Sequence, residues 1–199
     1  VTVQPLWDLY AAHFSDRDAV VGPAADDLRR AMEMIDYRAI RVSRGEIRFD
    51  RPGMAVTLNG IAQGFITDRV SGVLNRHGFT DVLVNMGEIR GSGRRPDGAP
   101  WRIGLQASAA QNDSGRKIDL VDGAIATSAG HGFVFDPSGR HHHLIDPRSG
   151  ESPHRWRSVS VIADTATTAD ALSTAFSCME RSAIDRVADT FGVRQIILA

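Results

Sequence analysis

The sequence holds one cysteine, Cys178, among its 199 residues, which excludes an intrachain disulfide. The apolar neighbours Phe176 and Met179 predict that this cysteine is a buried small hydrophobic side chain. No apolar run approaches the roughly 20 residues that a membrane-spanning helix needs. The formal net charge is −1, and the basic residues are scattered along the chain. Neither nucleic acid nor an anionic membrane surface is therefore indicated as a partner.

Several common motifs are also missing. The sequence has no P-loop ending in Gly-Lys-Ser/Thr, no Cys-x-x-Cys and no His-Glu-x-x-His. It does not begin with the basic and apolar regions of a secretory signal peptide, so export cannot be read from the chain itself. With 42% apolar residues over 199 positions, the sequence predicts one globular domain, residues 1–199, with a core of ordinary size.

Helical and strand patterns follow one another in mixed order, which predicts an α+β fold of mixed, mostly antiparallel sheets with packed helices. The predicted helices span residues 24–37, 64–77, 169–181 and 183–191, with Ser182 as the N-cap of the last one. The predicted strands span residues 38–42, 46–49, 81–85, 101–105, 117–121, 132–135, 158–162 and 193–198.

An aspartate and a threonine stand four positions apart in the segment 169–174 (ADALST). On a helix, this spacing directs the side chains of Asp170 and Thr174 toward one place. An anionic and a neutral oxygen on a rigid element suit a hard divalent cation such as Mg²⁺. The same pair also fits a helix cap or a solvated helix face, so the spacing alone does not decide between these interpretations.

A glycine-containing loop, 57–65 (TLNGIAQGF), precedes an amphipathic helical pattern. Gly60 and Gly64 would let a ligand approach the main chain, and a helix N-terminus offers free N–H groups to phosphate oxygens. The two glycines could equally serve tight helix packing, because Gly-x-x-x-Gly is unspecific.

Polar side chains are dense in the segments 126–130 (ATSAG) and 141–150 (HHHLIDPRSG). A histidine suits general base catalysis near neutral pH, and Asp146 could orient an imidazole or be structural. Three consecutive histidines could also bind zinc, but neighbours in sequence seldom point at a common centre. Thr127 and Ser128 fit either a loop closure or a contact to phosphate or flavin.

Five blocks of the sequence match one known pattern in the same order. They are 58–65 (LNGIAQGF), 83–90 (LVNMGEIR), 126–128 (ATS), 143–150 (HLIDPRSG) and 169–174 (ADALST). With them, the chain resembles the ApbE family of FAD:protein FMN transferases. The resemblance implies an ApbE-like (T-fold-like) architecture and a magnesium-dependent transfer of the FMN half of FAD to a threonine hydroxyl of an acceptor flavoprotein, with release of AMP.

The resemblance also implies roles for single residues. Asp170 and Thr174 would bind Mg²⁺ through their side chains, and Gly60 through its backbone carbonyl. His143 would be the base that takes the proton from the acceptor threonine. Thr57, Gln63 and Ile145 stand at positions that contact FAD in family members, and we expect Ser128 as a further FAD contact.

The chain departs from the family pattern in several places. Thr57 stands where many members carry Asp, and Gln63 where Lys is frequent. A charged contact to the nucleotide would then become a neutral hydrogen bond worth about 0.5–1.5 kcal/mol. Ser173 stands where some members have a further acidic residue, which makes the expected metal site less negative. The family also has a preceding portion, which we expect this chain to lack.

The segment 57–64 is similar to that of family members that accompany nitrous-oxide reductase assembly. We therefore expect a membrane redox subunit as the acceptor, and the family resemblance implies a periplasmic location. Two alternatives stay open. One is an FAD-binding maturation factor with little transferase activity, and the other is a metal-dependent FAD pyrophosphatase in which water is the nucleophile.

Overall fold

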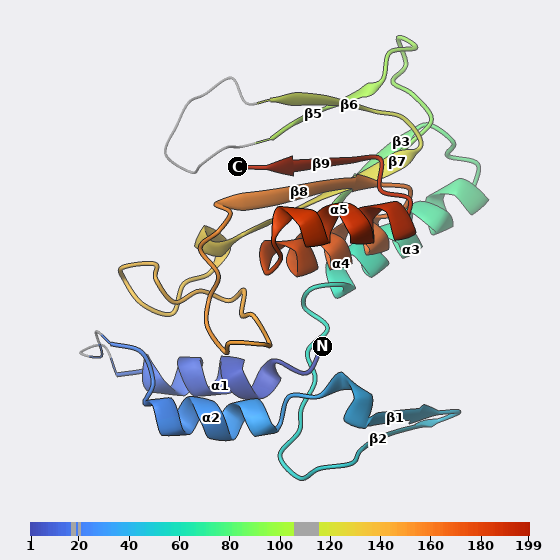
Figure 1. The fold of residues 1–199 in the computed structure, drawn as a ribbon. Helices are drawn as coiled ribbons and strands as arrows, with labels where there is room; N and C mark the ends of the chain where they lie inside the picture. Colours follow the sequence, from blue (N-terminus) through green and yellow to red (C-terminus); the bar gives the residue numbers. More distant parts are fainter. Residues whose placement is uncertain (17–18, 20, 106–115) are drawn as a thin grey trace. The chain divides into compact units, whose positions relative to one another are not determined.

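The computed structural model describes residues 1–16, 19, 21–105 and 116–199, and its elements are labelled in Figure 1. The chain forms two compact units, one of residues 1–58 and 130–154 and the other of residues 59–129 and 155–199. Each unit is assembled from two separate stretches of the chain, and a single-domain organisation stays a prediction. No helix among the described residues is both long and apolar enough to cross a bilayer.

In its described residues, the first unit contains two α-helices, two short 3-10 helices and a β-hairpin. Its elements are α1 (Gln4–His13), α2 (Ala25–Glu33), the 3-10 helix η1 (Tyr37–Ala39), β1 (Ile40–Ser43), β2 (Glu46–Phe49) and the 3-10 helix η2 (Gly130–Gly132). Leu6 and Tyr10 lie about one turn apart on α1 and are buried with Ala31 of α2 and Ile145. These four side chains form the core of the unit.

Outside residues 106–115, the second unit contains an antiparallel sheet, three helices and a separate hairpin. Its helices are α3 (Ala62–Arg76), α4 (Ala166–Ser177) and α5 (Arg181–Thr190). The sheet has the order β3-β4-β7-β8-β9, formed by Val82–Asn85, Ile89–Ser92, Gly123–Ala129, Ser158–Ala163 and Gln195–Leu198. The hairpin pairs β5 (Trp101–Gly104) with β6 (Lys117–Leu120). Because every pairing is antiparallel, the predicted α+β fold is confirmed.

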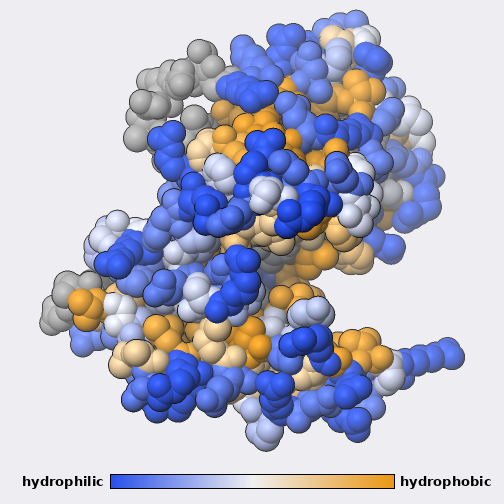
Figure 2. All heavy atoms as spheres, in the orientation of Figure 1, coloured by the Kyte–Doolittle hydropathy of each residue, from blue (hydrophilic) through white to orange (hydrophobic). Residues whose placement is uncertain are grey.

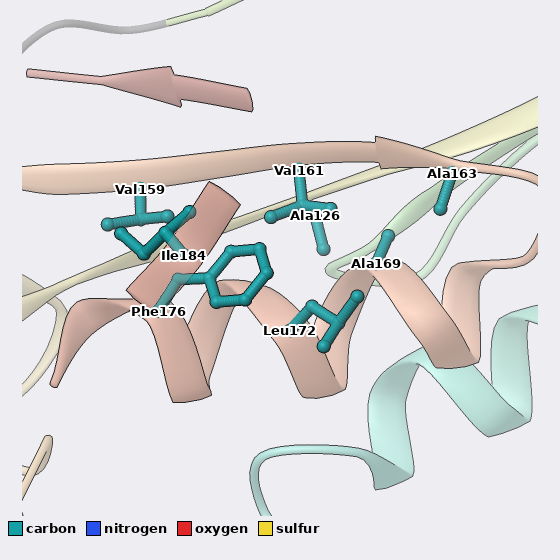
Figure 3. Close-up of a cluster of buried hydrophobic side chains, with 8 residues drawn as sticks. All are labelled: Ala126, Val159, Val161, Ala163, Ala169, Leu172, Phe176 and Ile184. Atoms are coloured by element: carbon teal, nitrogen blue, oxygen red, sulfur yellow. The ribbon is translucent and has the colours of Figure 1, made fainter. Parts of the chain in front are cut away.

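Two apolar layers lie on opposite faces of this sheet. Val159 and Val161 of β8 point toward Phe176 of α4 and Ile184 of α5 (Figure 3). Successive side chains of a strand point to opposite faces of the sheet. Ile162, which follows Val161 in β8, therefore belongs to the cluster formed with the β5–β6 hairpin. In the space-filling view, hydrophobic residues gather where that hairpin lies beside β9 (Figure 2). The helices α4 and α5 therefore pack in a defined position on one face of the sheet (Figure 1).

Some predicted elements are wrong. The sequence did not predict α1, β4 or β7. The helix predicted over 24–37 ends at Glu33, and the last helix has Glu180 rather than Ser182 as its N-cap. The predicted strand 132–135 is reduced to one bridge between Val134 and His142, because the turn at Asp136 follows directly. Cys178 is half-buried rather than buried.

Candidate active site

The N-terminus of α3 lies against α4 in the second unit. An added Cβ at Gly64 would lie 2.3 Å from the carbonyl oxygen of Ala166, so the two helix backbones approach closely here. One at Gly60 would lie 3.2 Å from Thr174 Oγ1. The two glycines therefore do serve helix packing, as one interpretation of the loop predicted. They also bring the backbone of residues 60–64 beside the face of α4 that carries Asp170 and Thr174.

Asp170 is a buried carboxylate at this junction, with 4% of its surface exposed. Its Oδ2 accepts a hydrogen bond of 2.8 Å from the Gly64 N–H, one of the donors that a helix N-terminus leaves without an intrahelical partner. Burial raises the pKa of Asp170, and the Gly64 N–H opposes that shift by stabilising the carboxylate. The carboxylate is thus fixed in place by α3 but incompletely compensated in charge.

Three hydroxyl groups continue the site from α4 to the end of β7. Ser173 donates to the backbone carbonyl of Asp170 over 3.0 Å. Ser128 Oγ lies 2.8 Å from Ser173 Oγ and 3.2 Å from Thr174 Oγ1. With the Ser173 proton used in this way, Ser128 can donate to Ser173 and accept from Thr174. This arrangement leaves lone pairs of Thr174 Oγ1 available to a ligand.

Glu88 is a second buried carboxylate of the site, and the sequence analysis gave it no role. It lies in the tight turn between β3 and β4, where the Met86 N–H donates to the Glu88 carbonyl over 3.1 Å. Gly87 has a φ of +103°, and an added Cβ there would lie 2.9 Å from Gln63 Nε2. The side chain of Gln63 therefore rests on the turn that carries Glu88.

The surroundings of Glu88 disfavour its charged form. Burial, and after it the negative charge of Asp170, raises the pKa of Glu88 to about 7, while the Thr127 N–H acts in the opposite direction. Glu88 is 8% exposed. A carboxylate shifted this far by burial and a like charge is typical of functional sites. The signal in the sequence was an acidic residue in a glycine turn between two strands, within the block 83–90 that resembles the family.

The donor atoms gathered here fit a hard cation. Burial disfavours the charged form of both carboxylates, and the charge of Asp170 adds to this effect at Glu88. A cation beside them would stabilise their charged forms, and oxygen donors are those that Mg²⁺ prefers. The backbone at Gly60 lies against Thr174, where the sequence analysis expected its carbonyl to act. In the described part of the chain, no group of three or more His, Cys, Asp and Glu side chains is arranged to hold a metal ion. The candidate set therefore depends on hydroxyl and carbonyl oxygens as well.

The three consecutive histidines have separate partners in the first unit. The ring of His141 packs against those of Tyr10 and Phe14, at centroid distances of 5.5 and 5.1 Å. His142 Nε2 lies 3.0 Å from the Pro153 carbonyl. His143 Nδ1 lies 3.1 Å from the carbonyl oxygen of Phe133, and because that oxygen only accepts, Nδ1 is the donor. In the neutral ring, Nε2 of His143 is then an acceptor, as a general base requires.

The remaining predicted residues also lie in the first unit. Thr57 donates its backbone N–H to the Val1 carbonyl over 2.8 Å. Ile145 is 5% exposed and packs in the core, so its side chain is unlike that of a ligand contact. Asp146 does not orient an imidazole, because it pairs with Arg148 at 2.7 Å and accepts from the backbone of the same residue. Arg148 and the neighbouring turn make the role of Asp146 structural.

The structure thus brings part of the predicted site together. Gly60, Gln63, Ser128, Asp170 and Thr174 converge in the second unit, with Glu88 as an addition. Thr57, His143 and Ile145 belong to the first unit. The roles of all these residues stay predictions.

Known proteins are similar to this chain in both sequence and fold. The ApbE family model matches residues 1–197. An FAD:protein FMN transferase of Vibrio cholerae is 35% identical over 185 residues, which cover 90% of this chain and 54% of that protein. One of Treponema pallidum is 30% identical, with 80% of this chain and 49% of that protein covered. The chain spans about half the length of these curated relatives.

Solved structures agree with the sequence matches. The flavin transferase ApbE of Vibrio cholerae matches with a TM-score of 0.83 at 29% identity. The match covers 100% of this chain and 63% of the Vibrio chain. The ApbE protein of Thermotoga maritima matches with a TM-score of 0.85 at 27% identity. This match covers 99% of this chain and 65% of the Thermotoga chain. Because the family model matches residues 1–197 of the 199 in this chain, the chain is a member of the ApbE family.

Proposed function

We propose that the chain is an FAD:protein FMN transferase that moves FMN from FAD to a threonine hydroxyl of an acceptor flavoprotein and releases AMP, with Mg²⁺ as its cofactor. The observation that carries the proposal is the convergence of the Asp170 carboxylate, the Thr174 hydroxyl and the Gly60 backbone at the start of α3. The relatives named FAD:protein FMN transferase support the same activity.

The reaction replaces the phosphoanhydride bond of FAD with a phosphate ester bond to the threonine. The threonine oxygen forms a bond to the phosphorus of the FMN half, and the bond from that phosphorus to the bridging oxygen breaks, so that AMP leaves with this oxygen. When bound, Mg²⁺ would neutralise the charge that develops on the phosphate oxygens. Asp170, Thr174 and Gly60 would hold it, and Gln63 and Ser128 would contact FAD.

The proton of the threonine hydroxyl must pass to a base during the transfer. We assign this step to His143, since its Nδ1 donates to the Phe133 carbonyl and its neutral ring has Nε2 free of a proton. Thr57 and the backbone of Ile145 are proposed as further FAD contacts. A membrane redox subunit as the acceptor and a periplasmic location rest on the family resemblance alone.

The test is a reconstitution with FAD, Mg²⁺ and a domain that carries a candidate acceptor threonine. We expect a covalent FMN adduct by mass spectrometry, with AMP released in equal amount, and loss of both with Asp170→Asn. His143→Ala should slow adduct formation, while His77→Ala, at an exposed histidine that ends α3, should not. FMN and AMP without an adduct would identify a pyrophosphatase, and bound but intact FAD would identify a maturation factor.

A further inference from the structure

Glu88 is a buried acidic side chain to which the proposed function assigns no role. Its turn is held by the Met86 hydrogen bond and by Gln63, which rests on Gly87. The Thr127 N–H stabilises its carboxylate, and the negative charge of Asp170 acts on it. Gly87 lies against Gln63, whose neighbour Gly64 donates to Asp170, and Thr127 precedes Ser128, which lies 3.2 Å from Thr174 Oγ1. The carboxylate therefore has a defined position beside the residues proposed to bind Mg²⁺.

Burying two carboxylates together is costly unless a positive charge compensates them. In the described part of the chain, no ion pair involves Glu88 or Asp170. The nearest arginine in sequence, Arg90, pairs with Asp68 at 2.7 Å. The described protein residues thus leave the negative charge at this place without a cationic partner.

The helix α4 by itself offers little negative charge to a cation. Asp170 is the one acidic residue of its span, and the hydroxyl of Ser173 is occupied by the Asp170 carbonyl and by Ser128. Since cation affinity in such sites rises with the number of charged ligands, a second acidic side chain from another element would have a large effect.

We propose that Glu88 is the second acidic residue of the Mg²⁺ site at Asp170, and that its charge, rather than its packing in the turn, sets the affinity of this site for the cation. Glu88 acts by adding a charge from the β3–β4 turn to the charge of α4. The inference rests on the proposed function, because it presupposes that Asp170 binds Mg²⁺.

The substitution Glu88→Gln separates charge from packing. Glutamine has nearly the same size and keeps a carbonyl oxygen that can accept from the Thr127 N–H. It removes only the charge. If charge is the role of Glu88, Mg²⁺ binding weakens by roughly 10–100-fold, a typical loss for a supporting residue of a metal site. The thermal midpoint without metal is then unchanged or raised, because a like-charge contact with Asp170 has been removed.

The measurement is isothermal titration of the 199-residue chain with MgCl₂, together with thermal midpoints with and without Mg²⁺. The variants are Glu88→Gln, Glu88→Asp, Asp170→Asn and, as a control, Glu46→Gln at an exposed glutamate of β2. We expect Asp170→Asn to abolish binding and Glu46→Gln to leave it unchanged. Glu88→Asp, which keeps the charge, should bind more tightly than Glu88→Gln.

Each other outcome overturns a defined statement. If the wild-type chain does not bind Mg²⁺, the metal part of the proposed function fails and the inference fails with it. If Asp170→Asn abolishes binding but Glu88→Gln binds as the wild type does, only the inference fails. A lower metal-free midpoint in Glu88→Gln would assign Glu88 a packing role and also overturn the inference.

Discussion

Asp68, on α3, is the residue that completes the N-terminus of α4. Its carboxylate accepts from the backbone N–H groups of Ala166 at 2.9 Å and Thr167 at 2.8 Å, and it pairs with Arg90 at 2.7 Å. Thr165 satisfies the next donor, the N–H of Thr168, at 3.1 Å. The N–H groups of residues 166–168 at this helix end therefore have partners, and a negative charge lies where the helix dipole favours it. This cap fixes where α4, and with it the helix face that carries Asp170 and Thr174, begins.

We expect Asp68→Asn to lower the free energy of unfolding by about 1–2 kcal/mol at neutral pH, as measured by urea denaturation. Burial alone would raise the pKa of Asp68, but the hydrogen bonds from Thr167 and Ala166 and the charge of Arg90 outweigh burial and lower it. A lowered folded pKa means that this stabilisation is present above the unfolded pKa of about 4 and disappears as the pH falls through the folded value.

The matched control is Asp185→Asn, which removes an exposed i,i+4 pair with Arg181 and should cost no more than about 0.5 kcal/mol. Equal losses in the two variants would contradict the capping role of Asp68. So would a difference between wild type and Asp68→Asn that persists undiminished in acid.

Single residues also show how far the sequence could predict the site. Asp170 and Thr174 were found because their relation is local, four positions along one helix, and the structure keeps them on one face. Glu88 was missed because its importance comes from Asp170, far away in the chain, and from burial that the turn itself does not specify. The protonated nitrogen of His143 depends likewise on the Phe133 carbonyl, ten residues away.

At the scale of elements, the contact between α3 and α4 depends on Gly64. An added Cβ would lie 2.3 Å from Ala166 O and 2.7 Å from Asp170 Cβ, and backbone atoms of a packed helix cannot move aside easily. We expect Gly64→Ala to destabilise the chain by about 1–3 kcal/mol in urea denaturation, although alanine is favoured over glycine in helices by about 1 kcal/mol.

Gly72, on the same helix, provides the control. Apart from the backbone of its own helix, a Cβ there would come within 4 Å of one described atom, Arg76 Nη1, at the ordinary contact distance of 3.6 Å. Gly72→Ala should therefore stabilise the chain by up to about 1 kcal/mol. Stabilisation by both substitutions would show that the helices can separate at Gly64 without cost, and that their close approach is not a requirement of the fold.

Small residues also explain which strands the sequence did not predict. β4 contains Gly91, where an added Cβ would lie 3.0 Å from Trp101 Cδ1 and 3.4 Å from Leu120 Cδ2 of the hairpin above it. Glycine and alanine have low strand propensity, so β4 and β7 lack the local signal that β8 has in its valines and isoleucine. In β4, a small residue is required because the β5–β6 hairpin packs closely against the strand at Gly91. Local sequence patterns do not show this packing, so they do not predict the strand.

At the scale of the whole molecule, each unit has its own core. Leu6 is fully buried with Tyr10 in the first unit, and Ile184 is fully buried with Phe176 in the second. Both units are discontinuous, and in the first one Tyr10 donates to the Gly150 carbonyl over 3.0 Å, across 140 positions of the chain. The contacts of residues 1–58 are thus completed by residues 130–154, which no reading of local patterns could reveal.

Two core substitutions test whether the units also unfold separately. Leu6→Ala and Ile184→Ala should each lower the stability of the unit that contains the residue by about 2–5 kcal/mol. We expect hydrogen–deuterium exchange after Leu6→Ala to rise most in residues 1–58 and 130–154, and after Ile184→Ala in residues 59–129 and 155–199, because local opening follows the loss of local packing. A rise of equal size over the whole chain in both variants would instead show one cooperative unit, and the single domain that the sequence predicts would then stand.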